Sequence, residues 1–87
     1  MSQPGTVAHR LVVYSRQGCE LCEEMIAELD FAQDVRLREF SVVDIDSDSQ
    51  LIEKYGLDIP VLTIDGQVIC RHHLDAAKIL AVLGKSG

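Results

Sequence analysis

The order of apolar and polar positions along the chain predicts three elements in its first half. A continuous apolar run predicts a buried strand over residues 10–15. A helix is expected from residue 20 to about residue 32, because its apolar side chains recur on one helical face: Leu21, Met25, Ile26 and Leu29. Residues 35–45, which become β-branched and apolar towards their end, are expected to form the second strand.

The second half of the chain contains clearer boundary signals. Residues 47–50 match a capping box and predict a short helix that runs to Tyr55 and is followed by Gly56. We expect three side chains of this helix to face inward: Leu51, Ile52 and Tyr55. A strand over residues 59–64 leads to a second strand over residues 67–70, and the Asp-Gly pair between them is a strong hairpin signal.

A last helix is expected from residue 74 or 75 to Leu83, where Gly84 ends it. The complete order is therefore β-α-β-α-β-β-α. A right-handed crossover makes the first two strands parallel, and the hairpin adds two antiparallel strands. We expect residues 1–9, which contain Pro4 and Gly5, to be a flexible lead, and residues 10–87 to form a single domain.

The candidate chemistry lies in two thiols separated by two residues, Cys19 and Cys22. The first predicted strand delivers Cys19 to the point where a helix begins. There the unpaired backbone N–H groups and the positive end of the helix dipole stabilise a thiolate. A thiolate is the nucleophile of disulfide exchange, and a second thiol one turn further on resolves the mixed disulfide. The pattern predicts that Cys19 attacks and that Cys22 resolves.

Charge and composition narrow the range of partners. The 87-residue chain has 14 acidic and 8 basic side chains and a net charge of −6, which argues against binding to nucleic acid or to anionic membranes. No segment reaches the roughly 18 consecutive apolar residues of a membrane span. The N-terminus has no pattern of a secretory signal. An odd number of cysteines, three, together with the paired thiols suits a reducing compartment, so we expect a cytoplasmic protein. A monomer is the default expectation.

These motifs together resemble the thioredoxin fold in its glutaredoxin-sized form. Residues 14–19 look like the glutaredoxin sequence before its first cysteine, and residues 58–61 fall where that family has its cis-proline motif. The C-x-L-C core is most similar to a glutaredoxin-like family of small, mostly bacterial proteins. The resemblance implies an α/β, thioredoxin-like fold with a four-stranded mixed sheet flanked by three helices. It also implies that Pro60 is cis and faces the disulfide.

If Pro60 is cis as the resemblance implies, it ends the strand pairing there and leaves the Ile59 backbone exposed, so Ile59 and Pro60 are expected to contribute to substrate binding. An extended peptide or thiol would pair with the exposed Ile59 backbone as an added strand. Arg16, in the loop before Cys19, is expected to favour the thiolate and contribute to substrate binding. No cofactor and no metal is expected.

Two departures from the glutaredoxin pattern bear on the substrate. The residues between the thiols are Glu20 and Leu21, whereas glutaredoxins have Pro-Tyr. Residues 70–73 contain no glycine, whereas glutaredoxins have there a Gly-Gly pair that holds the γ-glutamyl group of glutathione. Glu20, with Glu23 and Glu24, would repel the carboxylates of glutathione. The sequence therefore predicts a reductase of protein or small-molecule disulfides, recharged by a separate reductase or by glutathione.

Three alternatives remain open at this point. Cys19 and Cys22 could form half of a zinc site completed by Cys70, His72 and His73, which supply the right atom types. They could instead hold an iron–sulfur cluster, or the chain could be a redox-inactive adaptor. The simplest interpretation of Cys70 is a small buried strand residue. His72 and His73 are expected to be solvated at the entrance to the last helix.

Overall fold

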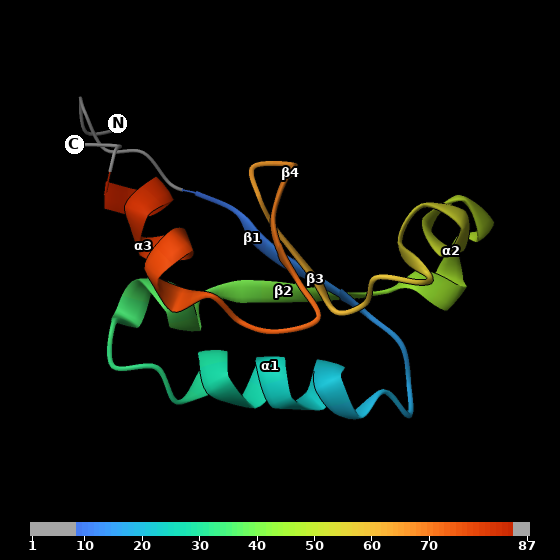
Figure 1. Cartoon of the computed structure of the whole chain (residues 1–87), viewed down its shortest axis with the longest axis horizontal. Coiled ribbons are helices and arrows are strands. Elements are labelled where there is room, and N and C mark those ends of the chain that lie inside the picture. Colours follow the sequence, from blue (N-terminus) through green and yellow to red (C-terminus); the bar gives the residue numbers. More distant parts are fainter. Residues whose placement is uncertain (1–8, 85–87) are drawn as a thin grey trace, which may run out of the picture.

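The computed structural model describes residues 9–84 of the chain, and its elements follow the predicted β-α-β-α-β-β-α order (Figure 1). Two short 3-10 turns, η1 and η2, lie on either side of the second strand. The bounds are β1 Leu11–Ser15, α1 Glu20–Asp30, η1 Val35–Arg38, β2 Phe40–Asp44, η2 Ile45–Ser47, α2 Ser49–Tyr55, β3 Val61–Ile64, β4 Gln67–Arg71 and α3 Ala76–Gly84. Of the predicted lead, all but His9 lies outside the described residues.

The sheet has the order β2-β1-β3-β4. Strands β1 and β2 are parallel, with Val13 opposite Val42, while β3 runs antiparallel to both β1 and β4. This arrangement confirms the predicted thioredoxin-like class, a four-stranded mixed sheet with three helices. The parallel pair requires α1 as its crossover, and this connection brings the beginning of α1 to the end of β1.

The main core lies between one face of the sheet and the helices α1 and α3. Alternate residues of β1 point into it, because successive side chains of a strand face opposite sides. Met25 and Leu29 of α1 are almost completely buried there, as the helical spacing predicts. The other buried members of this cluster are Leu11, Val13, Leu37, Leu62, Ile64, Ile69, Cys70, Ile79 and Leu83.

A smaller cluster attaches α2 to the other face of the sheet. Ile45, Tyr55 and Val61 are buried together, and the rings of Tyr14 and Tyr55 lie 4.6 Å apart between centroids. Helix α2 stands at the opposite end of the molecule from α3 (Figure 1). The side chain of Ile52 in α2 is 37% exposed, so the prediction that it faces inward is wrong.

The second strand is shorter than the pattern predicts, because residues 35–38 form the 3-10 turn η1. The Asp34 carboxylate caps this turn by accepting hydrogen bonds from the backbone N–H of Arg36 at 2.9 Å and from its guanidinium at 2.7 and 3.1 Å. This local side-chain bonding outweighs the β-branched character of Val35. Ile45, at the other end of the predicted strand, begins the turn η2.

Helix α2 ends at Tyr55 and is followed by Gly56, as predicted, but its N-cap differs from the prediction. Its N-cap is Asp48, whose carboxylate accepts the N–H of Gln50 at 2.9 Å, while the Ser47 hydroxyl donates to the Asp44 carbonyl at 2.6 Å. Gly56 caps the C-terminus in right-handed helical geometry. Glycine is needed there for space, since a Cβ atom would lie 2.5 Å from the Ile52 carbonyl oxygen.

The Asp-Gly hairpin is confirmed. Asp65 and Gly66 have φ of 53° and 85°, as a type I′ turn requires. The Asp65 carboxylate accepts the backbone N–H of Arg10 at 2.9 Å and lies 2.7 Å from Nδ1 of His9, so the turn also holds the chain that enters β1. Within residues 9–84, no helix has the length and apolar character needed to cross a membrane.

Candidate functional site

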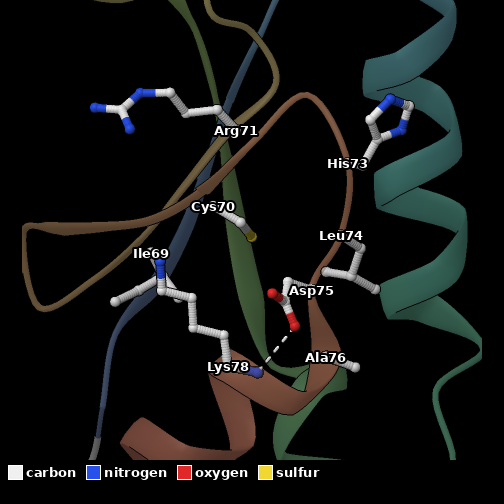
Figure 2. A pocket seen from close by; sticks show the side chains of 8 residues that line it. All are labelled: Ile69, Cys70, Arg71, His73, Leu74, Asp75, Ala76 and Lys78. Atoms are coloured by element: carbon white, nitrogen blue, oxygen red, sulfur yellow. Dashed lines mark hydrogen bonds between the residues drawn. The ribbon is translucent and has the colours of Figure 1, made fainter.

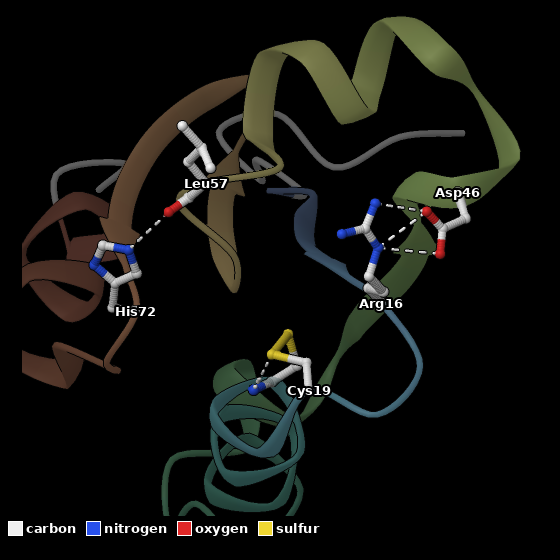
Figure 3. The surroundings of a disulfide bond; sticks show 6 residues. Arg16, Cys19, Asp46, Leu57 and His72 are labelled. Atoms are coloured by element: carbon white, nitrogen blue, oxygen red, sulfur yellow. Dashed lines mark hydrogen bonds and ion pairs between the residues drawn. A yellow bond between two sulfur atoms is a disulfide. The ribbon is translucent and has the colours of Figure 1, made fainter.

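The two thiols of the C-x-x-C motif lie where β1 passes into α1, and they are joined as a disulfide (Figure 3). Cys19 is the N-cap of α1 and Cys22 lies in its first turn, with 5.2 Å between their Cα atoms. Gly18, at a φ of 80°, turns the backbone from the loop into the helix. The predicted position of both sulfurs across the first turn of a helix is therefore confirmed.

The two sulfurs differ in access and in hydrogen bonding. Cys22 is 1% exposed, whereas Cys19 is only partly buried, so an incoming sulfur reaches Cys19 first. The backbone N–H of Cys22 donates to Cys19 Sγ at 3.2 Å. In the reduced protein the same N–H group and the helix dipole would stabilise negative charge on Cys19. The arrangement suits a nucleophilic Cys19 and a resolving Cys22.

Arg16 lies beside the site, but its charge is already paired. Its Nε and Nη2 atoms donate to the Asp46 carboxylate at 2.7 to 3.1 Å, and this contact raises the pKa of the guanidinium. Figure 3 shows the Arg16 side chain directed towards Asp46. The sequence missed this partner, which is 30 residues away. The Arg16 charge is thus paired with a carboxylate, and its effects on the Cys19 thiolate and on substrate binding stay predictions.

Three exposed carboxylates lie on the first turns of α1, the helix that carries the disulfide. They belong to Glu20, Glu23 and Glu24, and within residues 9–84 no salt bridge involves any of them. Since the Arg16 charge is offset, the surface around Cys19 is acidic, as the sequence indicates. An anionic ligand meets repulsion at this end of α1, and a basic one meets attraction.

The residues assigned to substrate binding lie in the segment that enters β3. The Ile59–Pro60 peptide bond is cis, and Pro60 is buried while Ile59 is partly exposed. The Pro60 carbonyl accepts the backbone N–H of His72 at 2.8 Å. Ile59 comes just before the β1–β3 ladder, whose last pair is Tyr14 and Val61.

His72 and Leu57 are neighbours of the disulfide that sequence reasoning did not connect (Figure 3). The Nε2 atom of His72 lies 3.4 Å from the Leu57 carbonyl oxygen, a hydrogen bond for the tautomer with its proton on Nε2. His72 is exposed, as predicted, and has a left-handed φ of 68°. The pattern of the sequence contains no signal for this contact, since it depends on how the end of β4 meets the loop after α2.

A small cleft of about 70 Å³ lies between α1 and the segment after β4. Its apolar lining comes from Leu21, Met25 and Leu74, and its polar lining is two carboxylates and two imidazoles: Glu24, Glu28, His72 and His73. By the glutaredoxin resemblance, this segment is where a glycine pair would hold the γ-glutamyl group of glutathione. Here this segment carries the side chains of His72 and His73, and the two glutamates that line the cleft come from α1.

Cys70 is a free thiol in β4 and is 9% exposed, in line with its interpretation as a buried strand residue. Burial raises the pKa of this thiol. It borders a shallow groove of about 490 Å³ (Figure 2). In the groove Asp75 caps α3 by accepting the N–H of Lys78 at 3.1 Å. In the described part of the chain, no group of three or more His, Cys, Asp or Glu side chains is placed to hold a metal ion, so this structure lends no support to the zinc alternative with Cys70, His72 and His73.

Comparisons with known proteins agree with this geometry. The family model of the glutaredoxin-like domain (DUF836) matches residues 10–84. A Dictyostelium discoideum protein described as a glutaredoxin-like protein YDR286C homolog is 31% identical over 72 residues, which cover 76% of this chain and 67% of the relative.

Two solved structures are similar along nearly their whole lengths. The solution NMR structure of a Nitrosomonas europaea protein has a TM-score of 0.77 and 37% identity, and covers 94% of this chain and 98% of its own. The X-ray structure of an X. campestris protein has a TM-score of 0.61 and 32% identity, with 86% and 96% coverage. Both similarities support a thioredoxin-like fold.

Proposed function

Because this chain belongs to the glutaredoxin-like domain family, we propose that it is a thiol-disulfide oxidoreductase that reduces disulfides in proteins through Cys19 and Cys22. The observation that carries the proposal is the Cys19–Cys22 disulfide at the N-terminus of α1, with one sulfur partly exposed and the other buried. A purely structural disulfide has no need of a helix N-cap position or of an N–H group aimed at its outer sulfur.

The proposed reaction has two exchange steps. The Cys19 thiolate attacks one sulfur of the partner disulfide, so a Cys19–partner bond forms and the other partner sulfur leaves and takes up a proton. Cys22 then loses its proton and attacks the Cys19 sulfur. The mixed disulfide breaks, the second partner sulfur is protonated, and Cys19–Cys22 is oxidised. Two electrons pass from the dithiol to the partner, which balances the reaction.

The backbone beside Pro60 supports binding of an extended polypeptide. Ile59 lies two residues before Val61, which pairs with Tyr14 in the β1–β3 ladder, and the contact between His72 and the Pro60 carbonyl fixes the position of this segment. A partner strand that pairs with Ile59 would carry its cysteine towards Cys19 by main-chain hydrogen bonds. Arg16 and Asp46, as a neutral pair, would border the same approach without attracting a carboxylate.

The acidic surface and the cleft after β4 support proteins over glutathione as substrates. Glu24 and Glu28 line the cleft that would have to accept a γ-glutamyl carboxylate. The carboxylates of these two glutamates and the γ-glutamyl carboxylate would repel each other, and the repulsion is greatest where solvent access is limited. We propose that a separate reductase recharges the oxidised pair more readily than glutathione does, and that the protein works in a reducing compartment such as the cytoplasm.

A single-turnover assay tests this function. The protein is fully reduced, freed of reductant, and mixed with either a peptide containing an intramolecular disulfide or glutathione disulfide. Mass spectrometry follows the loss of two hydrogen atoms, that is two protons and two electrons, from the protein as the Cys19–Cys22 disulfide forms. We expect the peptide to react at least about tenfold faster than glutathione disulfide, since only the latter adds carboxylates beside the acidic surface.

The controls separate the alternatives. Cys19→Ser should abolish exchange, whereas Cys70→Ser should leave it unchanged. Faster reaction with glutathione disulfide would contradict the substrate preference. A reduced protein that keeps both thiols in the presence of every disulfide would overturn the redox function and favour the adaptor.

A further inference from the structure

Leu57 exposes 96% of its surface, more than any other large apolar side chain in the described part of the chain. A single exposed leucine is ordinary on a protein surface. This one lies among the residues that surround the disulfide (Figure 3). In that view the His72–Leu57 contact is on one side of the sulfurs and the Arg16–Asp46 pair is on the other. Leu57 is therefore available to a partner that is bound at Cys19.

The backbone that carries Leu57 is fixed by contacts with the end of β4. The Leu57 carbonyl lies 3.4 Å from Nε2 of His72, and the Asp58 carboxylate lies 3.7 Å from Nε of Arg71. On the other side of Ile59, the Pro60 carbonyl accepts the His72 N–H at 2.8 Å. A side chain presented on a fixed backbone loses less conformational entropy when it binds. An exposed apolar group that is held in this way is typical of a recognition contact.

We propose that Leu57 is a specificity-determining residue that contacts an apolar side chain of the protein disulfide undergoing reduction. This inference rests on the function proposed above. Leu57 comes two residues before Ile59, where an added partner strand would pair, so it would meet a residue a few positions along that strand from the partner cysteine. In Figure 3 its side chain points away from the sulfurs, which fits contact with a neighbouring residue rather than with the reacting cysteine.

The charges around the site define the partner further. Glu20 and Glu23 are exposed at the beginning of α1. The partner segment is therefore an extended one that has an apolar residue near its cysteine and neutral or basic residues elsewhere. Glutathione has no apolar side chain that could contact Leu57, and it adds two carboxylates. The Leu57 contact would therefore favour protein disulfides over glutathione disulfide as substrates.

Two peptides test the proposal. They share one intramolecular disulfide and basic flanks, and they differ only at one position near the cysteine, which is Leu in the first and Ser in the second. Each reacts in a single turnover with the pre-reduced wild type and with Leu57→Ser. Phe31→Ser is the matched control, because Phe31 is 86% exposed and follows the other end of α1. Bis(2-hydroxyethyl) disulfide reports the intrinsic reactivity of the dithiol.

We expect Leu57→Ser to slow the Leu peptide about five- to tenfold, as loss of a partly buried leucine contact would, and to leave the Ser peptide and the small disulfide unchanged. Leu57→Met should restore most of the rate with the Leu peptide, and Phe31→Ser should have no effect. Equal rates of wild type and Leu57→Ser with the Leu peptide would overturn the proposal. Uniform slowing of all three substrates would overturn it too, because it would reveal a change in the dithiol itself.

Failure of the proposed function gives a different result. In that case the wild type exchanges with neither peptide nor with the small disulfide, and the variants show the same lack of exchange. Normal exchange without discrimination between the Leu and Ser peptides would refute only the role of Leu57.

Discussion

Arg16 and Asp46 form a bidentate ion pair beside the disulfide, with Nη2 of the guanidinium 2.7 Å and Nε 3.0 Å from the same carboxylate oxygen. The pair joins the loop before Cys19 to η2, and the two residues are 30 positions apart in the sequence. We therefore expect Asp46 to determine how much of the Arg16 charge acts on Cys19. Both side chains are partly exposed, so the pair contributes little to stability and its main influence is on the local potential.

Replacement of Asp46 tests this control. Asp46→Asn should leave the Arg16 charge unbalanced and so increase the fraction of Cys19 thiolate at neutral pH. We expect the reduced protein to be alkylated at Cys19 by iodoacetamide about two- to fivefold faster than the wild type. The double variant with Arg16→Gln should react at close to the wild-type rate. An unchanged rate in Asp46→Asn at low salt would show that this potential does not reach the sulfur.

The order of the two cysteines in the reaction can be tested by trapping. Cys22→Ser removes the resolving sulfur, so its Cys19 should accumulate as a stable mixed disulfide with a peptide partner, at close to one partner per protein chain. Cys19→Ser should accumulate almost none, because Cys22 is 1% exposed. Intact-mass spectrometry without reductant measures both. Trapping mainly in Cys19→Ser would reverse the assigned roles.

Acid should destabilise the protein partly through Asp34. Hydrogen bonds from the Arg36 side chain and backbone lower the pKa of Asp34 from its ordinary value of 3.8 to about 2. Because the folded-state value is the lower one, this contribution to stability is complete above the ordinary value and is lost as the pH falls towards about 2. The melting temperature of Asp34→Asn should therefore fall less steeply across that window than that of the wild type.

A matched variant isolates this effect. Asp30→Asn removes another exposed carboxylate from the same region, one that forms no salt bridge among the described residues. It should keep the wild-type dependence of melting temperature on pH. Parallel curves for the wild type and Asp34→Asn would contradict the role of the Asp34–Arg36 contact.

Two glycines that end helices should respond differently to alanine. At Gly56 a Cβ atom would approach the Ile52 carbonyl oxygen to 2.5 Å, so Gly56→Ala should lower the free energy of unfolding by about 1–3 kcal/mol. At Gly84 nothing lies within 4 Å of the added atom, and Gly84→Ala should be neutral or stabilising by up to about 1 kcal/mol. Urea denaturation measures both, and equal effects would contradict the steric explanation.

The sequence by itself determined the element order and the place of the reactive thiols, because these depend on local signals. The apolar run of β1, followed after the loop of residues 16–18 by Cys19 and a helical pattern, was enough to put a thiol at a helix N-cap. The Asp65-Gly66 turn was equally local, since its backbone requires residues that accept positive φ. Local hydrogen bonding also explains two errors at element boundaries, because Asp34 caps the turn η1 and Asp48 caps helix α2, and a hydrophobic pattern indicates neither.

The tertiary structure alone decided what surrounds the thiols. The pairing of Arg16 with Asp46 and the contact of His72 with Leu57 join residues 30 and 15 positions apart. The position of β2 beside β1 sets the first contact, and the position of the β4 end beside the loop after α2 sets the second. Hydrophobic periodicity indicates which side of an element is buried. The packing of whole elements decides which side chains from different elements come into contact.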